Sequence, residues 1–147
     1  MRAAIFLILA TGCGRLSTFE DLAHATVGYL ADRDFDGHVS TILTAEQLFA
    51  LCPRETRHDL KLTKFRESFD KCLERFLFED AKVESVTADL ETFAPHQEGC
   101  GNPETVISAD RIKVRVSARG FNYEFMIDDA IETPEGWRLD DDLSCPE

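Results

Sequence analysis

The sequence lacks an apolar run long enough to cross a bilayer, is poor in basic residues and has no closely spaced pair of cysteines. A membrane-spanning helix takes about 20 consecutive apolar residues, and the apolar run at the N-terminus is far shorter. The 16 Lys and Arg residues are outnumbered by 28 Asp and Glu residues, which gives a net charge of −12. This excess of negative charge disfavours binding to nucleic acids and peripheral binding to anionic lipid head groups, since both depend on clustered Lys and Arg side chains.

Sequence motifs that are typical of known enzyme classes are also missing. The chain contains no G-x-S-x-G nucleophile turn, no P-loop and no H-E-x-x-H pair. Side chains able to act as acid or base are present at His24, Tyr29, His38 and Tyr123, but no spacing ties any of them to a carboxylate partner. We therefore expect structural roles for all four, and we assign no catalytic residue, no metal ligand and no cofactor.

The first thirteen residues combine a positive charge, a short apolar run and a cysteine. Arg2 precedes the run, which ends in Ala10, Thr11, Gly12 and Cys13. This segment resembles the lipobox of bacterial lipoproteins, although its leucine lies one place earlier than usual. The resemblance implies cleavage before Cys13, diacylglyceryl attachment to its sulfur and acylation of the new amine. The competing interpretation is a secretory signal in which Cys13 is incidental.

The lipobox resemblance sets the expected location and domain organisation. It implies a signal peptide over residues 1–12, a lipidated tether over 13–16 and a single domain over 17–147. The domain would be anchored to the bacterial cell envelope through lipid, and Gly14 after the cysteine favours the outer membrane, facing the periplasm or the cell exterior. An apolar content of 44% with 11 Phe residues indicates a packed core rather than a disordered acidic stalk.

The remaining cysteines are Cys52, Cys72, Cys100 and Cys145. An even number of cysteines behind an export signal predicts two disulfides and no free thiol. We favour Cys52 with Cys72 and Cys100 with Cys145, while the other two pairings stay open. Zinc binding is the weaker alternative because the cysteines are widely spaced.

Three-residue and four-residue apolar spacings predict helices in the first half of the chain. Ser17-Thr-Phe-Glu20 is a capping-box pattern that starts a helix ending near Asp32, and Thr44-Ala-Glu-Gln47 starts another that ends before Pro53. A third helix runs from about Glu55. The predicted buried faces are Phe19, Leu22, Ala23, Thr26, Val27 and Leu30 in the first helix, and Leu62, Phe65, Phe69, Cys72, Leu73 and Phe76 in the third.

The segment from Asp32 to Leu43 matches part of an EF-hand calcium loop. It has carboxylates at positions 1, 3 and 5 and Gly37 at position 6, but position 12 is Leu43 where a bidentate Glu is required. The alternative is a join between two helices. We favour the helix join and keep a degenerate, EF-hand-like calcium-binding protein as an alternative function.

Beyond Asp80 the apolar period changes to two, which predicts half-buried antiparallel strands with a hairpin turn at Arg119-Gly120. One face is expected to pack on the third helix, and it consists of Ile112, Val114, Val116, Phe121, Tyr123, Phe125, Ile127 and Trp137. The opposite face is expected to carry Lys113, Arg115, Asn122 and Glu124 into water.

Helices followed by an antiparallel meander that ends in Gly136-Trp-x-Leu139 resemble the NTF2-like (SnoaL-like, cystatin-like) α+β fold. This resemblance implies a curved antiparallel sheet wrapped around N-terminal helices as a cone, with a pocket between them. The predicted function is a non-catalytic, lipid-anchored domain that binds a small apolar ligand or an envelope protein. The alternative is a hydrolase or isomerase of the same fold. A cone filled by its own Phe side chains favours the first; a large apolar pocket with an isolated His or Asp favours the second.

Overall fold

The computed structural model describes residues 15–51, 62–93 and 106–146 of the chain. Within these residues, helices come first and strands follow, as the change of period predicts. The helices are α2 (Phe19–Asp32), α3 (Phe35–Val39), α4 (Ala45–Leu51) and α5 (Leu62–Arg75), and the strands are β1 (Lys82–Phe93), β2 (Val106–Ala118), β3 (Phe121–Thr133), β4 (Gly136–Leu139) and β5 (Leu143–Ser144).

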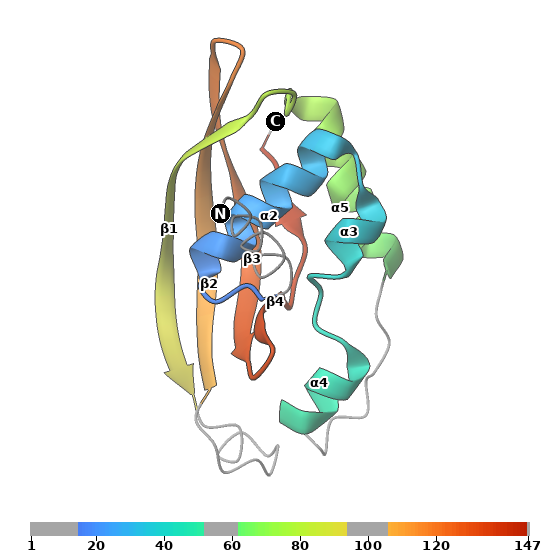
Figure 1. Cartoon of the computed structure of the whole chain (residues 1–147), viewed down its shortest axis with the longest axis vertical. Coiled ribbons are helices and arrows are strands. Elements are labelled where there is room, and N and C mark those ends of the chain that lie inside the picture. The colour runs from blue at the N-terminus through green and yellow to red at the C-terminus, as the bar shows by residue number, and fades with distance from the viewer. Residues whose placement is uncertain (1–14, 52–61, 94–105, 147) are drawn as a thin grey trace, which may run out of the picture.

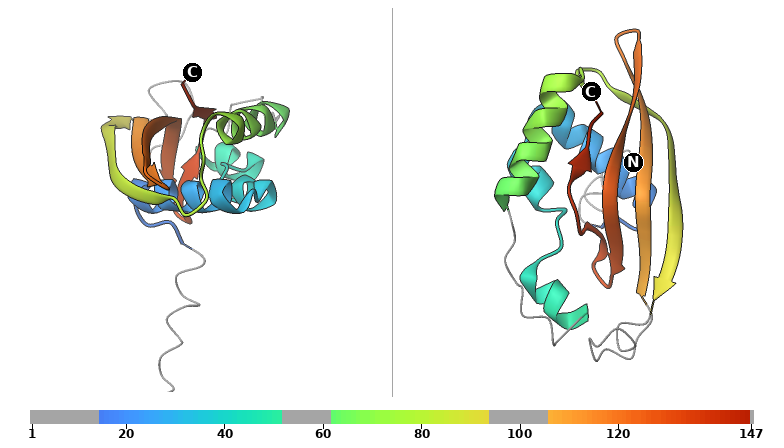
Figure 2. Two further views of the ribbon diagram at one scale, coloured as in Figure 1. Left: turned by 90° about the horizontal axis from the view of Figure 1, so that it is seen from above. Right: turned by 180° about the vertical axis from the view of Figure 1, so that it is seen from behind.

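The strands form one antiparallel sheet in the order β1-β2-β3-β4, and the short strand β5 also pairs with β3. The sheet is curved, and the helices gather on one side of it (Figures 1 and 2). The predicted α+β class, with N-terminal helices packed on a curved antiparallel sheet, is confirmed. None of the helices in the described residues is long and apolar enough to cross a membrane.

Helix α2 begins one residue later than the predicted capping box. Thr18 is the N-cap, and its hydroxyl accepts a hydrogen bond from the N–H of Asp21, while the Asp21 carboxylate accepts one from the N–H of Thr18. Ser17 and Thr18 are each followed three residues later by an acidic residue, Glu20 or Asp21. The capping-box pattern therefore allows the helix to start after either hydroxyl residue. The predicted buried face is confirmed, with Phe19 partly buried at its start.

The segment after α2 is a helix join. The Asp34 carboxylate accepts a hydrogen bond from the N–H of Gly37 at 2.9 Å and so caps the short helix α3. This residue holds position 3 of the EF-hand pattern, and its carboxylate is used by the backbone of its own turn. The preference for a helix join is confirmed.

Helix α2, rather than α5, contacts most of the sheet. It contacts β1, β2 and β4, whereas α5 contacts β5, α2 and α3. The predicted packing of the sheet face on the third helix is confirmed in part, since Phe65 and Phe69 of α5 belong to the same buried cluster as that face, but α2 shares the role. Helix α5 also lies against the C-terminal segment. It is joined to it by the disulfide between Cys72 and Cys145 and by a hydrogen bond from the N–H of Leu143 to the Ser68 hydroxyl.

The disulfide joins Cys72 of α5 to Cys145, with Cα atoms 5.3 Å apart. The favoured pairing of Cys72 with Cys52 and of Cys145 with Cys100 is therefore wrong, because folding brings the C-terminus next to α5 across 73 residues of sequence. Cys52 and Cys100 lie outside the described residues. If the chain forms two disulfides, as their number predicts, the second joins Cys52 to Cys100.

The predicted sheet face is largely confirmed. Its fully or nearly fully buried members are Ile112, Val114, Val116, Phe125, Ile127 and Trp137. Tyr123 is half-buried, and its ring stacks on Phe76 with centroids 4.4 Å apart. Phe121 is 66% exposed, contrary to prediction. It follows the turn at the tip of the β2–β3 hairpin, which extends beyond the helices (Figure 1), so no helix of the described residues covers it there.

Aromatic side chains fill the space between helices and sheet. The Phe78 ring contacts Phe125 edge-on at 5.9 Å between centroids, and Phe35 contacts Phe69 at 5.5 Å. Phe65, Phe69, Phe78 and Phe125 are all buried. The core is thus a packed aromatic cluster, which is the arrangement that the sequence analysis associated with a non-catalytic domain.

Candidate functional site

A cleft of about 600 Å³ lies beside the core, between α5 and the strands β3 and β5. Helix α5 supplies its polar face to one wall, and β3 and the C-terminal segment supply the other. Its principal polar residues are Lys64, Glu67, Ser68, Lys71, Glu124, Asp128, Asp142 and Ser144, and its apolar residues include Phe125, Met126 and Leu143.

The arrangement of this wall follows from the register of the strands. Met126 pairs with Ser144 and Ile127 with Leu143, so the residues just before β5 are held against the next part of β3. The N–H of Asp128 donates to the carbonyl of Asp142 at 3.0 Å, which continues this ladder by one residue. Sequence positions 128 and 142 are therefore neighbours in the cleft.

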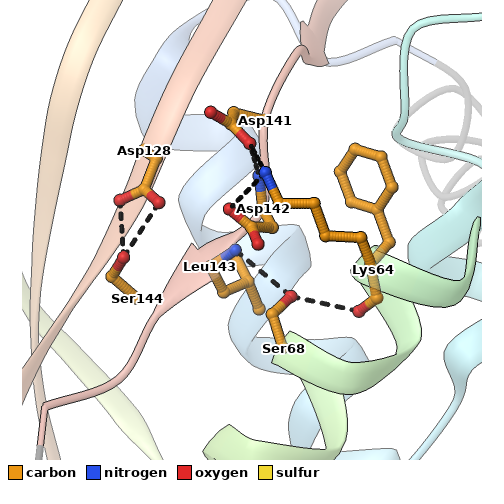
Figure 3. A network of polar contacts seen from close by, with 8 residues as sticks. Lys64, Ser68, Asp128, Asp141, Asp142, Leu143 and Ser144 are labelled. Carbon is orange, nitrogen blue, oxygen red and sulfur yellow. Dashed lines mark hydrogen bonds and ion pairs between the residues drawn. The ribbon is translucent and has the colours of Figure 1, made fainter. Parts of the chain in front are cut away.

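A polar network occupies one end of the cleft (Figure 3). The ammonium group of Lys64 lies 3.0 Å from a carboxylate oxygen of Asp141 and 3.7 Å from one of Asp142. The Ser144 hydroxyl lies 2.7 and 2.8 Å from the two carboxylate oxygens of Asp128. Each carboxylate in the network thus has a protein partner, and Asp141 and Asp142 share Lys64.

The three carboxylates stand close together. Single oxygens of Asp128, Asp141 and Asp142 all lie within 4.8 Å of one another. Burial raises the pKa of the Asp142 carboxyl, and its hydrogen bond with Asp141 raises it further. Burial acts in the same direction on Asp141, but hydrogen bonds from Lys64 and from the N–H of Asp142 outweigh it and hold the pKa of Asp141 below its usual value. As the pH falls, Asp142, with a pKa of about 6, therefore takes up a proton before Asp141, which keeps its negative charge beside Lys64.

This network attracts positive charge and is already partly neutralised by Lys64. Oxygen ligands of this kind suit a hard cation or an amine, and the Lys64 ammonium group fills that role within the chain. In the sequence, the acidic run 140–142 is separated from Asp128 by more than ten residues. No local signal joins them, because their proximity depends on the pairing of β3 with β5.

His38 is the one predicted acid–base candidate that is completely buried. Its ring lies 5.0 Å from Phe69 and 6.2 Å from Phe35, between centroids, and neither ring nitrogen has a hydrogen-bond partner among the described residues. Burial lowers the pKa of His38 from 6.5 to about 4, because a charged imidazolium loses its hydration in this apolar surrounding. His38 is therefore neutral in the folded protein near neutral pH.

We predict that His38 makes the fold sensitive to acid. The unfolded chain binds a proton near pH 6.5 and the folded chain only near pH 4, so this stability is complete above pH 6.5 and decreases as the pH falls to about 4. Between pH 7.5 and 4.5 the loss should be about 2–3 kcal/mol. Urea denaturation of the wild type and of His38→Leu at both pH values measures it, and His38→Leu should lack this part of the loss.

The matched control is His24→Leu, which replaces an exposed histidine on α2 and should keep the pH dependence of the wild type. Asp129 has its pKa raised to about 6 by burial and by its neighbours Asp140 and Asp110, so it acts in the opposite direction. Its contribution is common to all three proteins and cancels in the comparison. Equal pH dependence in His38→Leu and the wild type would contradict the prediction.

The other predicted residues are dispersed. His24 is exposed, Tyr29 is half-buried, and the Tyr123 hydroxyl donates to the carbonyl of Leu77 at 2.6 Å. Burial raises the pKa of Tyr123 to about 12. In the described part of the chain no hydrogen bond links any two of the four candidates, and none of them lines the cleft. Cys13 lies outside the described residues.

Comparisons with known proteins provide no further guide to the site. The sequence matches no protein-family model, no curated protein and no solved structure.

Proposed function

We propose that this protein is a lipid-anchored protein of the bacterial cell envelope, whose NTF2-like domain binds a small ligand or a protein partner without catalysis. The observation that carries the binding role is the cleft between α5, β3 and β5, which lies outside the aromatic core and is lined by both charged and apolar side chains. Clefts with an apolar floor and a few placed polar groups are typical of binding sites.

A binding role fits the distribution of acid–base groups better than a catalytic one. An enzyme needs a base or acid that reaches its substrate and a partner that tunes it. His38 is enclosed by aromatic rings, and the Tyr123 hydroxyl is engaged by a backbone carbonyl. The carboxylates of the cleft are instead engaged by Lys64 and Ser144, an arrangement suited to recognising charge.

Anchoring is supported by the sequence at Arg2 and at residues 3–13, which resemble a lipobox. Two or three acyl chains anchor a protein far more stably than one, with each buried CH₂ contributing about 0.8 kcal/mol. Cys13→Ala should therefore release the domain into the soluble fraction or leave the precursor uncleaved, as cell fractionation and metabolic labelling with palmitate would show. A Cys13→Ala protein that is processed and still needs detergent for extraction would contradict the anchor.

The cleft can be tested with a pair of matched substitutions on α5. Glu67 lines the cleft and Glu74 does not, although both are exposed. In a screen of small molecules by NMR, compounds that bind the wild type should also bind Glu74→Trp and should lose binding to Glu67→Trp, where the indole occupies the entrance. Compounds that bind Glu67→Trp as well as the wild type would place the binding site elsewhere.

A further inference from the structure

Strand β3 has an edge that is only partly occupied. On one side it pairs with β2 from Phe121 to Ile131. On the other side β4 pairs with residues 130–133 and β5 with residues 126–127. Within the described part of the chain, residues 121–125 therefore have a strand on one side only, and Glu124 and Phe125 of this segment line the cleft.

The turn at the hairpin tip determines which backbone groups face this free edge. Arg119 and Gly120 both have positive φ, at 49° and 86°, as in the two-residue turns that close a hairpin on a hydrogen-bonded pair. Ala118 and Phe121 are that pair, so odd-numbered residues of this segment bond to β2. The N–H and C=O groups of Asn122 and Glu124 then point to the free edge, in phase with Met126, which pairs with Ser144.

The chain itself shows that this edge accepts a strand and why β5 ends early. The register that places Ser144 opposite Met126 would place Pro146 opposite Glu124. Proline has no N–H to donate, and the preceding residue, Cys145, is held to α5 by its disulfide. The two features stop β5 after Ser144 and leave the edge-facing groups of Asn122 and Glu124 without a strand partner among the described residues.

Charge at the cleft determines the kind of strand that fits. Glu67, Glu124, Asp128 and Asp142 line it together with Lys64 and Lys71. Lys64 is already engaged by Asp141 and Asp142, and Glu124 by Arg115. The excess is negative, as is the whole chain at −12. A second copy of this chain would bring like charge to the edge, whereas a basic segment would be attracted.

We propose that an extended, lysine-rich or arginine-rich segment of a partner protein adds to β3 as a further strand, with backbone hydrogen bonds to Asn122 and Glu124. This inference rests on the cleft proposed above as the binding site and names its partner. Strand addition of this kind takes affinity from main-chain hydrogen bonds and specificity from side chains along the groove.

The probe is a blocked peptide of about six residues, the usual strand length, that alternates Lys and Thr. Its control has Glu in place of Lys. When the Lys peptide binds the full domain, hydrogen exchange should slow at the amides of Asn122 and Glu124 and stay unchanged at Tyr123 and Phe125, which already bond to β2. The Glu peptide should not bind. Binding without protection at Asn122 and Glu124, equal binding of both peptides, or no binding of the Lys peptide would each overturn the proposal.

A pair of variants at Glu124 separates the backbone from the side chain. Glu124→Pro removes the N–H that faces the free edge, where proline is tolerated because no ladder bond is lost, and it should weaken Lys-peptide binding about tenfold or more. Glu124→Gln keeps the N–H and should weaken binding only a few-fold. Equal affinities of the two variants would refute strand addition. Small molecules that are sensitive to Glu67→Trp would still support the cleft itself, and protection of the same amides by self-association would assign the edge to a second copy.

Discussion

Phe125→Ala is expected to lower the free energy of unfolding by about 3 to 5 kcal/mol, a large part of the 5 to about 15 kcal/mol typical of a whole domain. Phe125 is completely buried in the sheet, opposite Val114 of β2, and its ring meets Phe78 edge-on. Truncation removes apolar surface from the core and leaves a cavity that neighbouring rings, held in their own packing, fill only in part. Urea denaturation followed by circular dichroism measures the change in midpoint.

Glu124→Ala provides the control, because Glu124 is the neighbouring residue of β3 and points to the opposite face. Its carboxylate lies 3.1 Å from Arg115 in a largely exposed ion pair, and such pairs contribute little. The change in unfolding free energy should stay within about 0.5 kcal/mol. If the two substitutions shifted the midpoint equally, the register of β3 and the assignment of its faces would be incorrect.

Removal of the Cys72–Cys145 disulfide is the second substitution with a large expected effect. The bond closes a loop across 73 residues of sequence, and in the chain-entropy model a loop of this length stabilises the fold by about 4 kcal/mol. The double variant Cys72→Ala/Cys145→Ala avoids a lone reactive thiol. Its urea midpoint should fall by the corresponding amount relative to the oxidised wild type.

The same double variant should also loosen the C-terminus from α5. Beside the disulfide, the C-terminal segment is held to α5 by the hydrogen bond from the N–H of Leu143 to Ser68 and by the Lys64 ion pairs. Hydrogen exchange at Ser144 should therefore rise more than exchange at Val114, in the middle of the sheet. An unchanged midpoint, or peptide mapping that joins Cys72 to another cysteine, would contradict the assignment of this bond.

Local patterns predicted the elements well where the partner of a residue lies a few positions away. The capping box of Thr44 and Gln47 has both of its hydrogen bonds, at 3.0 and 3.1 Å. The alternation of Ile112, Val114 and Val116 with exposed Lys113 and Arg115 appears as predicted. Caps and pleats are determined by backbone geometry over one turn or two residues, so the sequence displays them directly.

The same patterns failed where exposure depends on what covers a residue. Phe121 continues the alternation of Phe125 and Ile127, yet it lies at the tip of the hairpin, beyond the helices. His38 lies in an acidic, polar segment that gives no sign of burial, and α3 nevertheless places its ring against Phe69. Periodicity identifies a face of an element but carries no information about the length or position of the layer that packs on it.

The sequence by itself determined the α+β class, the order of helices and strands, the helix caps and most of the buried sheet face, because each of these depends on neighbours in the chain. Tertiary structure alone decided the pairing of Cys72 with Cys145, the gathering of Asp128, Asp141 and Asp142 around Lys64, and the free edge of β3 beside the cleft. These features join residues dozens of positions apart. Their proximity is set by strand register and by the docking of α5, which depend on the packing of the whole core rather than on any local segment.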